Sequence, residues 1–269
     1  MSSPPNIYLQ LTGQFNDGKL RCVISSGQAV VLHRLAIMSK DGDWILREDA
    51  ETTEHVLRVL DSHRATYRFG APLDVRWLKG GWSSHFEFTR DSLRVRTDFV
   101  TRPPRLTTSD LDRLWKEQSG RPTPFLDARD LADVKKTDRE KDYAVIGELA
   151  RLMNDVRDQL LYSRSARDLS RLANENPAMV KPLAARRPLL TLIASGQDAL
   201  EVALDAERRA LMHANEKRLD GYRRAAERWA SLWPTLDKEI TGRSLLVAHS
   251  ILVKRAEGVL PFHSQGEAQ

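Results

Sequence analysis

The amino-acid sequence predicts an α+β fold, in which a mixed β-sheet with flanking helices is followed by an all-helical C-terminal domain. Short β-branched or alternating segments, which are typical of strands, lie before the prolines at 103 and 104, where regular structure stops. From about Ser109 the chain is rich in Leu, Ala, Arg and Glu at helical spacing. We therefore expect an α+β domain over residues 1–122 and a helical domain over residues 123–269.

The first domain is expected to alternate between strands and helices. The predicted strands cover 21–26, 42–48, 73–78, 84–89 and 93–100, and the predicted helices cover 27–38 and 50–63. Apolar and polar residues alternate in the last of these strands. One face carries Leu93, Val95, Thr97 and Phe99, and the other carries Arg94, Arg96 and Asp98.

Prolines are expected to divide the helical domain into several helices. These residues are Pro177, Pro182, Pro188 and Pro234. Between residues 198 and 233 acidic and basic side chains are interspersed, which indicates a solvated helix with ion pairs rather than a nucleic-acid-binding stripe. Trp229 and Trp233 are four residues apart, so we expect them to share one helix face and to pack in the core.

Composition and charge limit the classes of function. The chain has 269 residues, and its net charge of +5 permits a polyanionic partner such as nucleic acid but does not require one. Its one cysteine, Cys22, lies in an apolar segment, which excludes a disulfide framework or a cysteine zinc site and fits a reducing compartment. No secretory leader and no apolar run of membrane-spanning length is visible. We therefore expect a cytoplasmic protein with no membrane partner.

The segment SKDGDWIL, residues 39–46, has two interpretations. Asp-Gly between apolar runs is typical of a tight hairpin turn, in which Asp41 and Asp43 would be turn residues only. Alternatively, two carboxylates two residues apart on a strand point to the same face, where they could hold a metal ion. Gly42 favours the hairpin, because glycine weakens the interior of a strand.

The order of the surrounding pieces favours the strand. Ser26 and Gly27 follow the first predicted strand, a segment of helix length leads to Asp41 and Asp43, and Asp98 lies on a later polar strand face. This order resembles the nucleotidyltransferase fold superfamily, in which a small-residue turn, an Asp-x-Asp pair and a third carboxylate follow one another. The resemblance implies a nucleotidyltransferase-like sheet with Asp41, Asp43 and Asp98 as catalytic and metal-binding residues.

The chemistry of nucleotidyl transfer explains why such residues are needed. Negative charge develops on the attacking and leaving oxygens at the α-phosphate, and two divalent ions can stabilise both oxygens. Mg²⁺ prefers oxygen ligands and is usually held by a few carboxylates together with substrate phosphates. A small-residue turn lets backbone N–H groups approach the triphosphate. The resemblance thus implies an NTP substrate and Mg²⁺ or Mn²⁺ as the cofactor.

The resemblance is closest to the bacterial AbiE-type nucleotidyltransferase-like proteins, which include toxins of toxin–antitoxin and phage-defence systems. VISSGQAVVLHR and SKDGDWIL are similar to the strand, turn, helix and Asp-x-Asp motif of this family, with Ser39 at the hydroxyl position before the carboxylates. DLADVKKTDREKDY is similar to a later basic helix of the family. The resemblance implies that Ser26, Gly27, Ser39, Lys135 and Arg139 contact the nucleotide.

The resemblance covers residues 20–145 and implies an enzyme that moves an NMP group from an NTP to an acceptor hydroxyl. The implied acceptor is an RNA such as tRNA, or a protein, and the implied protein partner is a cognate antitoxin. Two departures from the family pattern, Ser26 in place of glycine and Gly42 in place of an apolar residue, motivate an alternative. In that alternative the chain is a catalytically inactive member of the same fold that acts as a regulatory or nucleic-acid-binding module.

The segment KGGWSSHFEF, residues 79–88, matches no motif of known chemistry. A turn followed by an ordinary strand is favoured over a polar site made of Ser83, Ser84 and His85. The chain has no P-loop, GxSxG or HExxH motif, so other well-defined chemistries are poorly supported.

Overall fold

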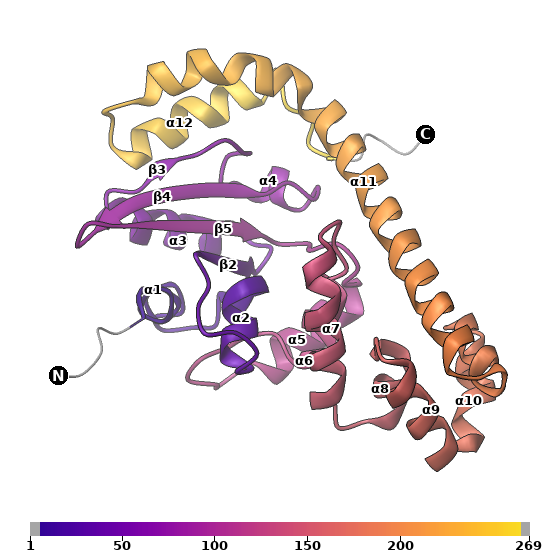
Figure 1. Ribbon diagram of the computed structural model, residues 1–269. Coiled ribbons are helices and arrows are strands. Elements are labelled where there is room, and N and C mark those ends of the chain that lie inside the picture. Colours follow the sequence, from indigo (N-terminus) through magenta and orange to yellow (C-terminus); the bar gives the residue numbers. More distant parts are fainter. Residues whose placement is uncertain (1–5, 265–269) are drawn as a thin grey trace. The chain divides into compact units, whose positions relative to one another are not determined.

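The computed structural model describes residues 6–264 and contains a five-stranded mixed β-sheet with helices around it (Figure 1). The strands are β1 (Cys22–Ser25), β2 (Asp41–Leu46), β3 (Thr66–Tyr67), β4 (Ser84–Arg90) and β5 (Leu93–Val100). Their order in the sheet is β1-β2-β5-β4-β3. β2 and β5 are parallel, whereas the other neighbouring strands are antiparallel. The mixed α+β class predicted from the sequence is therefore confirmed.

Helices precede, separate and follow the strands. Those up to the end of the sheet region are α1 (Ile7–Phe15), α2 (Ser26–Leu32), α3 (Ala50–Ser62), α4 (Val75–Leu78) and α5 (Thr108–Glu117). The later ones are α6 (Ala128–Val134), α7 (Glu140–Leu152), α8 (Val156–Tyr162), α9 (Ala166–Glu175), α10 (Pro177–Ala184), the 3-10 helix η1 (Pro188–Ser195), α11 (Gln197–Ile240) and α12 (Leu245–Ala256).

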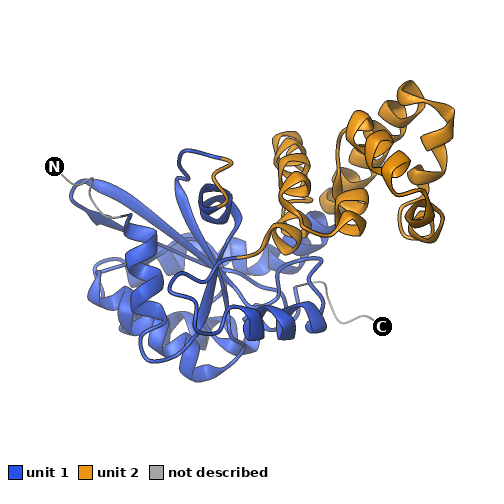
Figure 2. Cartoon of the chain, turned by 90° about the horizontal axis from the view of Figure 1, so that it is seen from below, with its two compact units in different colours: residues 1–32, 36–125, 218–269 blue, residues 33–35, 126–217 orange. Residues whose placement is uncertain are grey.

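The chain forms two compact units (Figure 2). Unit 1, which contains the sheet, comprises Met1–Leu32, Ala36–Phe125 and Arg218–Gln269, and unit 2 comprises His33–Leu35 and Leu126–Lys217. The predicted boundary at residue 122 lies close to the end of the sheet region, but the last part of the chain was expected in the helical domain and instead belongs with the sheet.

Hydrogen bonds from three buried tryptophans explain why the C-terminal segment belongs to unit 1. Trp229 on α11 donates its indole N–H to the Gly70 carbonyl over 2.9 Å. Trp77 and Trp82 donate theirs to carbonyls at 260 and 261, over 3.1 and 2.8 Å. Indole groups are usually hydrogen-bonded when they are buried, so these contacts fix the return of the chain. Contacts between segments this far apart in sequence are not encoded in local periodicity.

Three local predictions are corrected by the structure. The predicted strand 73–78 is wrong, because Asp74 caps α4 by accepting a hydrogen bond from the Arg76 N–H. The predicted helix 27–38 ends at Leu32, and Ile37 beyond it is 99% exposed. Pro182 and Pro234, which were expected to separate helices, lie inside α10 and α11.

The core side of the sheet is built around Trp44. Its ring stacks on Phe99 with centroids 5.4 Å apart and meets the edge of Phe15 from α1 at 5.3 Å. The indole N–H donates to the Thr12 hydroxyl, also on α1, over 2.9 Å. Because β2 and β5 both contribute aromatic rings here, packing of α1 also fixes the two parallel strands relative to each other.

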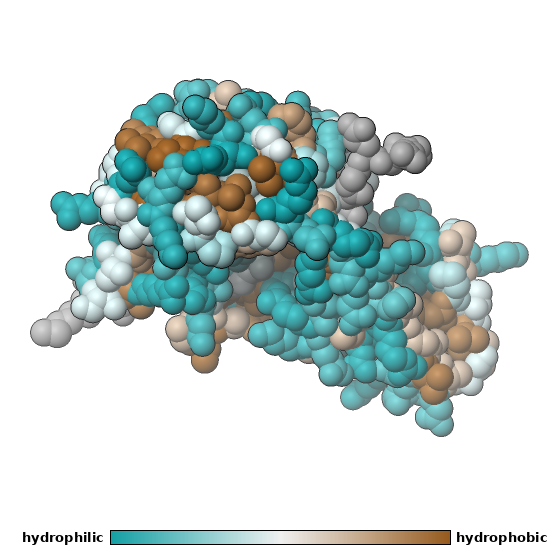
Figure 3. Space-filling model, turned by 90° about the horizontal axis from the view of Figure 1, so that it is seen from above, coloured by the Kyte–Doolittle hydropathy of each residue, from teal (hydrophilic) through white to brown (hydrophobic). Residues whose placement is uncertain are grey.

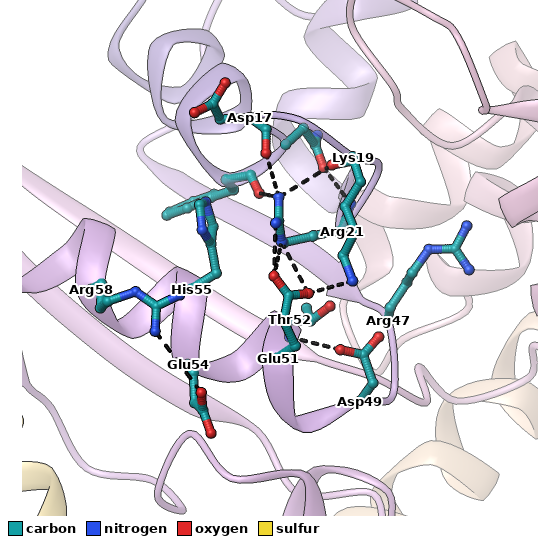
Figure 4. A network of polar contacts seen from close by, with 12 residues as sticks. Asp17, Lys19, Arg21, Arg47, Asp49, Glu51, Thr52, Glu54, His55 and Arg58 are labelled. Atoms are coloured by element: carbon teal, nitrogen blue, oxygen red, sulfur yellow. Dashed lines mark hydrogen bonds and ion pairs between the residues drawn. The ribbon is translucent and has the colours of Figure 1, made fainter.

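A charged network joins the start of β1 to α3 (Figure 4). The Arg21 guanidinium is buried and donates to both the Glu51 carboxylate and the Asp17 carbonyl, the latter over 2.6 Å. Lys19 also contacts Glu51. Hydrogen bonds from Arg21 and then from Lys19 lower the pKa of Glu51 to about 2, so this carboxylate stays ionised at neutral pH.

His249 on α12 lines a cavity of about 270 Å³ together with the charged side chains of Glu54, Asp74 and Arg76. Its Nδ1 lies 2.8 Å from the Tyr67 hydroxyl, which already accepts the backbone N–H of residue 73 over 3.0 Å. Tyr67 therefore donates to Nδ1, and we infer the neutral imidazole with its proton on Nε2. Burial lowers the pKa of His249, while the charge of Asp74 opposes this shift.

Lowering the pH is expected to destabilise unit 1 through His249. Because burial lowers its pKa in the folded chain, the unfolded chain takes up the proton first as the pH falls below about 6.5. The stabilising contribution of neutral His249 is complete above that pH and is lost on the acid side. Urea unfolding at about pH 7.5 and about pH 5.5 measures this difference in unfolding free energy. His249→Gln, which can still accept a hydrogen bond, should reduce it, and an unchanged difference would contradict this account.

Unit 2 has an apolar core of its own. Its buried members are Leu160, Ala166, Leu169, Leu172, Ala173, Leu183, Leu189, Leu190, Leu200 and Leu204. Beside them Arg187 is 3% exposed, and its guanidinium donates to Glu207 and to two backbone carbonyls. Burial alone would raise the pKa of Glu207, but the hydrogen bonds and charge of Arg187 lower it.

Apolar side chains also reach the surface of α12. Leu246 and Val247 are 42% and 45% exposed. Figure 3 shows apolar atoms gathered on the face of unit 1 that carries this helix. Among the residues that the structure describes, no helix combines the length and apolar character needed to cross a membrane.

Candidate active site

Five polar residues form one row across the entire sheet, on the face opposite to Trp44. They are Ser25 on β1, Asp43 on β2, Asp98 on β5, His85 on β4 and Arg68 directly after β3. Neighbouring strands lie about 4.8 Å apart, and residues directly opposite each other share a face. The row therefore brings Asp43 and Asp98 side by side, as the resemblance implies. We call these five residues the polar row.

Asp41 lies on the same face as the polar row, two residues from Asp43 along β2. The whole segment 41–46 is one strand, so the hairpin interpretation of SKDGDWIL is wrong. Arg96 is opposite Asp41 on β5, with its Nη1 atom 3.7 Å from Asp41 Oδ1. Within the described residues that oxygen is shielded from solvent and accepts no hydrogen bond.

Two side chains of neighbouring strands, His85 and Arg68, contact the third carboxylate. His85 Nδ1 lies 2.7 Å from Asp98 Oδ1, and Arg68 Nη1 lies 3.5 Å from the same oxygen. The other ring nitrogen of His85, Nε2, lies 2.8 Å from the Ser83 hydroxyl, which is in turn 3.2 Å from the Tyr222 hydroxyl of α11. Asp98 is thus the first member of a chain of polar contacts that leads away from the Asp41–Asp43 pair.

The first residues of α2, which directly follows β1, are closely packed against the chain at the start of β2. Ser26 has a φ of +48°, a left-handed conformation that is uncommon outside glycine and is often found at functional sites. A Cβ on Gly27 would come within 2.2 Å of Ser39 Oγ. Gln28 donates to the backbone carbonyls of Ser39 and Asp41 over 3.2 and 3.3 Å. The predicted nucleotide-contacting residues Ser26, Gly27 and Ser39 therefore lie together beside Asp41.

Packing accounts for the glycine between the two aspartates. A Cβ on Gly42 would meet the Trp44 ring at 2.4 Å and the Tyr8 ring at 2.5 Å. Tyr8 also donates its hydroxyl to the Lys40 carbonyl over 2.6 Å. Burial first, and then the negative charge of Asp41, raise the pKa of this phenol. The departure from the family pattern at Gly42 therefore lies on the core face of β2 and leaves both carboxylates on the opposite face.

Gly27→Ala is expected to lower the free energy of unfolding by about 1–3 kcal/mol, because the new methyl group would overlap Ser39 Oγ. The double variant Gly27→Ala, Ser39→Gly removes the overlapping atoms and should recover most of this loss. Gly13→Ala is the matched control, since no atom lies within 4 Å of the Cβ that it adds on α1. Urea unfolding of the variants measures the effects, and an equal loss in the double variant would contradict the contact.

The donor atoms of the site have the chemistry that a divalent metal requires. Asp41, Asp43 and Asp98 supply carboxylate oxygens, and the shielded Asp41 Oδ1 that accepts no hydrogen bond is an anionic atom suited to a cation. Among the described residues no three His, Cys, Asp or Glu side chains converge closely enough to hold a metal. Binding would therefore require the Asp98 carboxylate to turn away from His85 and Arg68.

Lys135 and Arg139, the predicted phosphate contacts, belong to unit 2. The Lys135 ammonium is buried and donates to Asp142 Oδ1 over 3.3 Å. Arg139 and Thr137 donate to the other oxygen, over 2.9 and 2.6 Å. Burial alone would raise the pKa of Asp142, but these hydrogen bonds and charges lower it. Both cations therefore have a carboxylate partner within unit 2, and their contact with a nucleotide stays a prediction.

The sequence analysis did not predict that four further residues contact one another beside Asp98. They are His85, Arg68, Ser83 and Tyr222. The sequence analysis favoured an ordinary strand over a polar site at His85, and the pairing of His85 with Asp98 was not predicted. The predicted strands 84–89 and 93–100 are joined by a short connection, and such a connection fixes which of their residues lie opposite each other. This was the feature of the sequence that could have indicated the pairing of residues 85 and 98.

Comparison with family models, with curated proteins and with solved structures gives no match to this chain. The functional interpretation therefore depends on the site itself.

Proposed function

We propose that the chain is a metal-dependent nucleotidyltransferase that moves an NMP group from an NTP to an acceptor hydroxyl. The observation that carries the proposal is the direct pairing of Asp43 and Asp98 on adjacent parallel strands, with Asp41 on the same face. Carboxylate oxygens gathered on one face are the ligands that a divalent cation such as Mg²⁺ prefers. The close packing of Gly27 against Ser39 beside this cluster supports a nucleotide site at the same end of β2.

Each part of the site has a distinct role in the proposed reaction. Asp41, Asp43 and Asp98 would hold Mg²⁺ or Mn²⁺, which neutralises charge on the attacking and leaving oxygens when it is bound. Ser26 and Gly27 at the start of α2, with Ser39 packed against Gly27, would position the triphosphate. Asp98, on the side of the row that continues to β4, would receive the proton of the acceptor hydroxyl.

The direct test is incubation of the full chain with labelled NTPs, Mg²⁺ and either total RNA or total protein. Transfer of label is expected for the wild type and is expected to fall at least about 100-fold in Asp41→Asn, because a metal ligand is lost. Asp91→Asn is a matched control: it makes the same chemical change at a side chain 94% exposed in the β4–β5 turn. Undiminished transfer by Asp41→Asn would rule out the assignment.

One observation favours the alternative of a catalytically inactive module. Two of the carboxylates already have a fixed cation beside them, Arg96 beside Asp41 and Arg68 beside Asp98. Such side chains can stabilise the sheet without a metal ion. Calorimetric titration with Mg·NTP separates the two proposals: measurable binding is expected for the enzyme, and no heat of binding with any common NTP would favour a regulatory or nucleic-acid-binding role.

The acceptor and the biological setting are proposed on the resemblance alone. An RNA end such as that of tRNA, or a protein hydroxyl, is the proposed external acceptor, and the mild positive charge is compatible with RNA. A role as the toxin of a toxin–antitoxin or phage-defence pair, with a cognate antitoxin as its partner and a cytoplasmic location, belongs to the same proposal.

A further inference from the structure

A cavity of about 460 Å³ lies between α1, α2 and the turn that joins β4 to β5 (Figure 1). Leu93 and Val95 line it from β5, on the same strand face as Phe99, which stacks on Trp44. The cavity is therefore on the opposite face of the sheet from the polar row. Ser39 is the predicted nucleotide contact that also lines it. The volume is in the range of natural small-molecule sites, about 300–1,000 Å³.

The walls of the cavity are largely apolar and reach the solvent. Ile7 lines it from α1, Val31 from α2, and Ile37 and Met38 from the segment that leads to β2. Ile37 and Met38 are 99% and 71% exposed, and Leu93 is 59% exposed. Large apolar side chains left in water around a cavity of this size are typical of a surface that a ligand covers.

Three side-chain oxygens of the cavity lining have no hydrogen left to donate. The Gln28 side chain is 3% exposed, and its amide nitrogen donates to the carbonyls of residues 39 and 41. Two carbonyl partners fix the orientation of this amide, so Gln28 Oε1 is an acceptor, and no hydrogen bond from the described residues reaches it. The Ser39 and Tyr8 hydroxyls donate to the carbonyls of residues 41 and 40, over 3.2 and 2.6 Å. A ligand bound beside these oxygens must therefore bring the hydrogens.

Negative charge acts on the same part of the lining. Burial first, and then the charge of Asp41, raise the pKa of the Tyr8 phenol. Asp43 acts in the same direction, whereas Arg96 opposes both carboxylates. Acceptor oxygens beside two carboxylates and one guanidinium favour a ligand group that both donates hydrogen bonds and carries positive charge.

The rim of the cavity does not select a charge of its own. Arg90 and Asp91 line it with one charge of each sign, and Arg90 Nε lies 3.8 Å from Asp91 Oδ2. The Arg90 guanidinium also donates to Gln10 Oε1 over 2.6 Å. The sign of charge that the site prefers is therefore set by its inner oxygens and the carboxylates near them.

We propose that this cavity binds an arylalkylamine, a small molecule in which an apolar ring carries a primary ammonium group. The ammonium has three donors and no acceptor, and it would donate to the oxygens of Gln28, Ser39 and Tyr8. The ring would cover the exposed side chains of Ile37 and Met38. This inference does not depend on the proposed function, because it uses none of the carboxylates as ligands.

The test follows the methionine methyl NMR signals of the full chain during titration with phenethylamine and tryptamine. Phenylpropionate and indolepropionate are the matched controls, since they have the same rings and an acceptor-only anionic end. The Met38 signal, identified by its loss in Met38→Leu, should shift saturably with the amines. Binding of the carboxylates should be at least about tenfold weaker. The signals of Met153 and Met179, which do not line the cavity, should not move.

A pair of variants tests the site independently of the probe. Leu93→Lys places a second cation in the lining and should raise the dissociation constant of tryptamine at least about tenfold. Leu246→Lys makes the same change at an exposed leucine of α12 outside the cavity and should leave the dissociation constant unchanged. Circular dichroism of both variants shows whether each has kept its fold.

Each other outcome would overturn the proposal. A Met38 signal that neither amine moves, or shifts at Met153 and Met179 in its place, would rule out this cavity as the site. Equal binding of amines and carboxylates would rule out recognition of the ammonium. An equal loss of affinity in Leu93→Lys and Leu246→Lys would show that only the net charge of the chain matters. None of these results bears on nucleotidyl transfer, which the labelling experiment measures separately.

Discussion

Trp44→Ala is expected to lower the free energy of unfolding by about 3–5 kcal/mol, which is a large fraction of the stability of a typical domain. The Trp44 side chain is 1% exposed, stacks on Phe99 and donates to Thr12, so its removal leaves a cavity and takes away the donor whose hydrogen bond the Thr12 hydroxyl accepts. Because Trp44 directly follows Asp43, the loss also releases the strand that carries the two predicted metal ligands. Urea unfolding followed by tryptophan fluorescence and circular dichroism measures the change.

Trp115→Ala provides the matched control for this effect. Trp115 on α5 is half-buried, and its ring contacts the Arg47 guanidinium with the centroid 4.7 Å from the guanidinium carbon. The same atoms are removed, but the ring is in part solvated already, so we expect a loss of only about 1 kcal/mol. Comparable losses in the two variants would contradict the view that the core of unit 1 is centred on Trp44.

The sequence was sufficient to predict the elements that carry the carboxylates. Polar and apolar side chains alternate in the strand that contains Asp98, so its polar face could be predicted from the sequence. The pairing of His85 with Asp98 follows from the connection between β4 and β5. This connection consists of Asp91 and Ser92, which have φ angles of +49° and +63°. Two residues with positive φ form a type I′ turn, and counting outward from such a turn pairs residue 85 with residue 98.

Other features depend on contacts that no local pattern encodes. The segment 73–78 has the spacing of a strand, but Asp74 caps a helix whose Trp77 is fully buried against the C-terminal segment. Pro234 lies inside a helix because tertiary packing of Trp229 holds that segment against the sheet unit. Gly42, which argued for a turn, instead accommodates two aromatic rings on the core face. In each case a long-range contact overrides the local preference.

Asp43→Asn is expected to have opposite effects on activity and on stability. Transfer of label from NTP should fall at least about 100-fold, because loss of a metal-binding oxygen removes several kcal/mol of transition-state stabilisation. In the metal-free chain the unfolding free energy should rise by about 0.2–1 kcal/mol, because Asp43 no longer opposes the like charge of Asp98 on β5. Functional sites commonly carry such a cost in stability, whereas a purely structural carboxylate does not.

Asp91→Asn again distinguishes a specific effect from a general loss of charge, since its side chain is exposed and its positive φ suits asparagine. We expect neither its activity nor its stability to differ from the wild type by more than about 0.5 kcal/mol. Adding Mn²⁺ should stabilise the wild type and the Asp91 variant against urea but leave Asp43→Asn nearly unaffected, because ligand binding stabilises only a chain that binds the ion. A lower stability of Asp43→Asn in the absence of metal would instead indicate that Asp43 is a structural residue, held in the sheet by its neighbours rather than kept there for a cation.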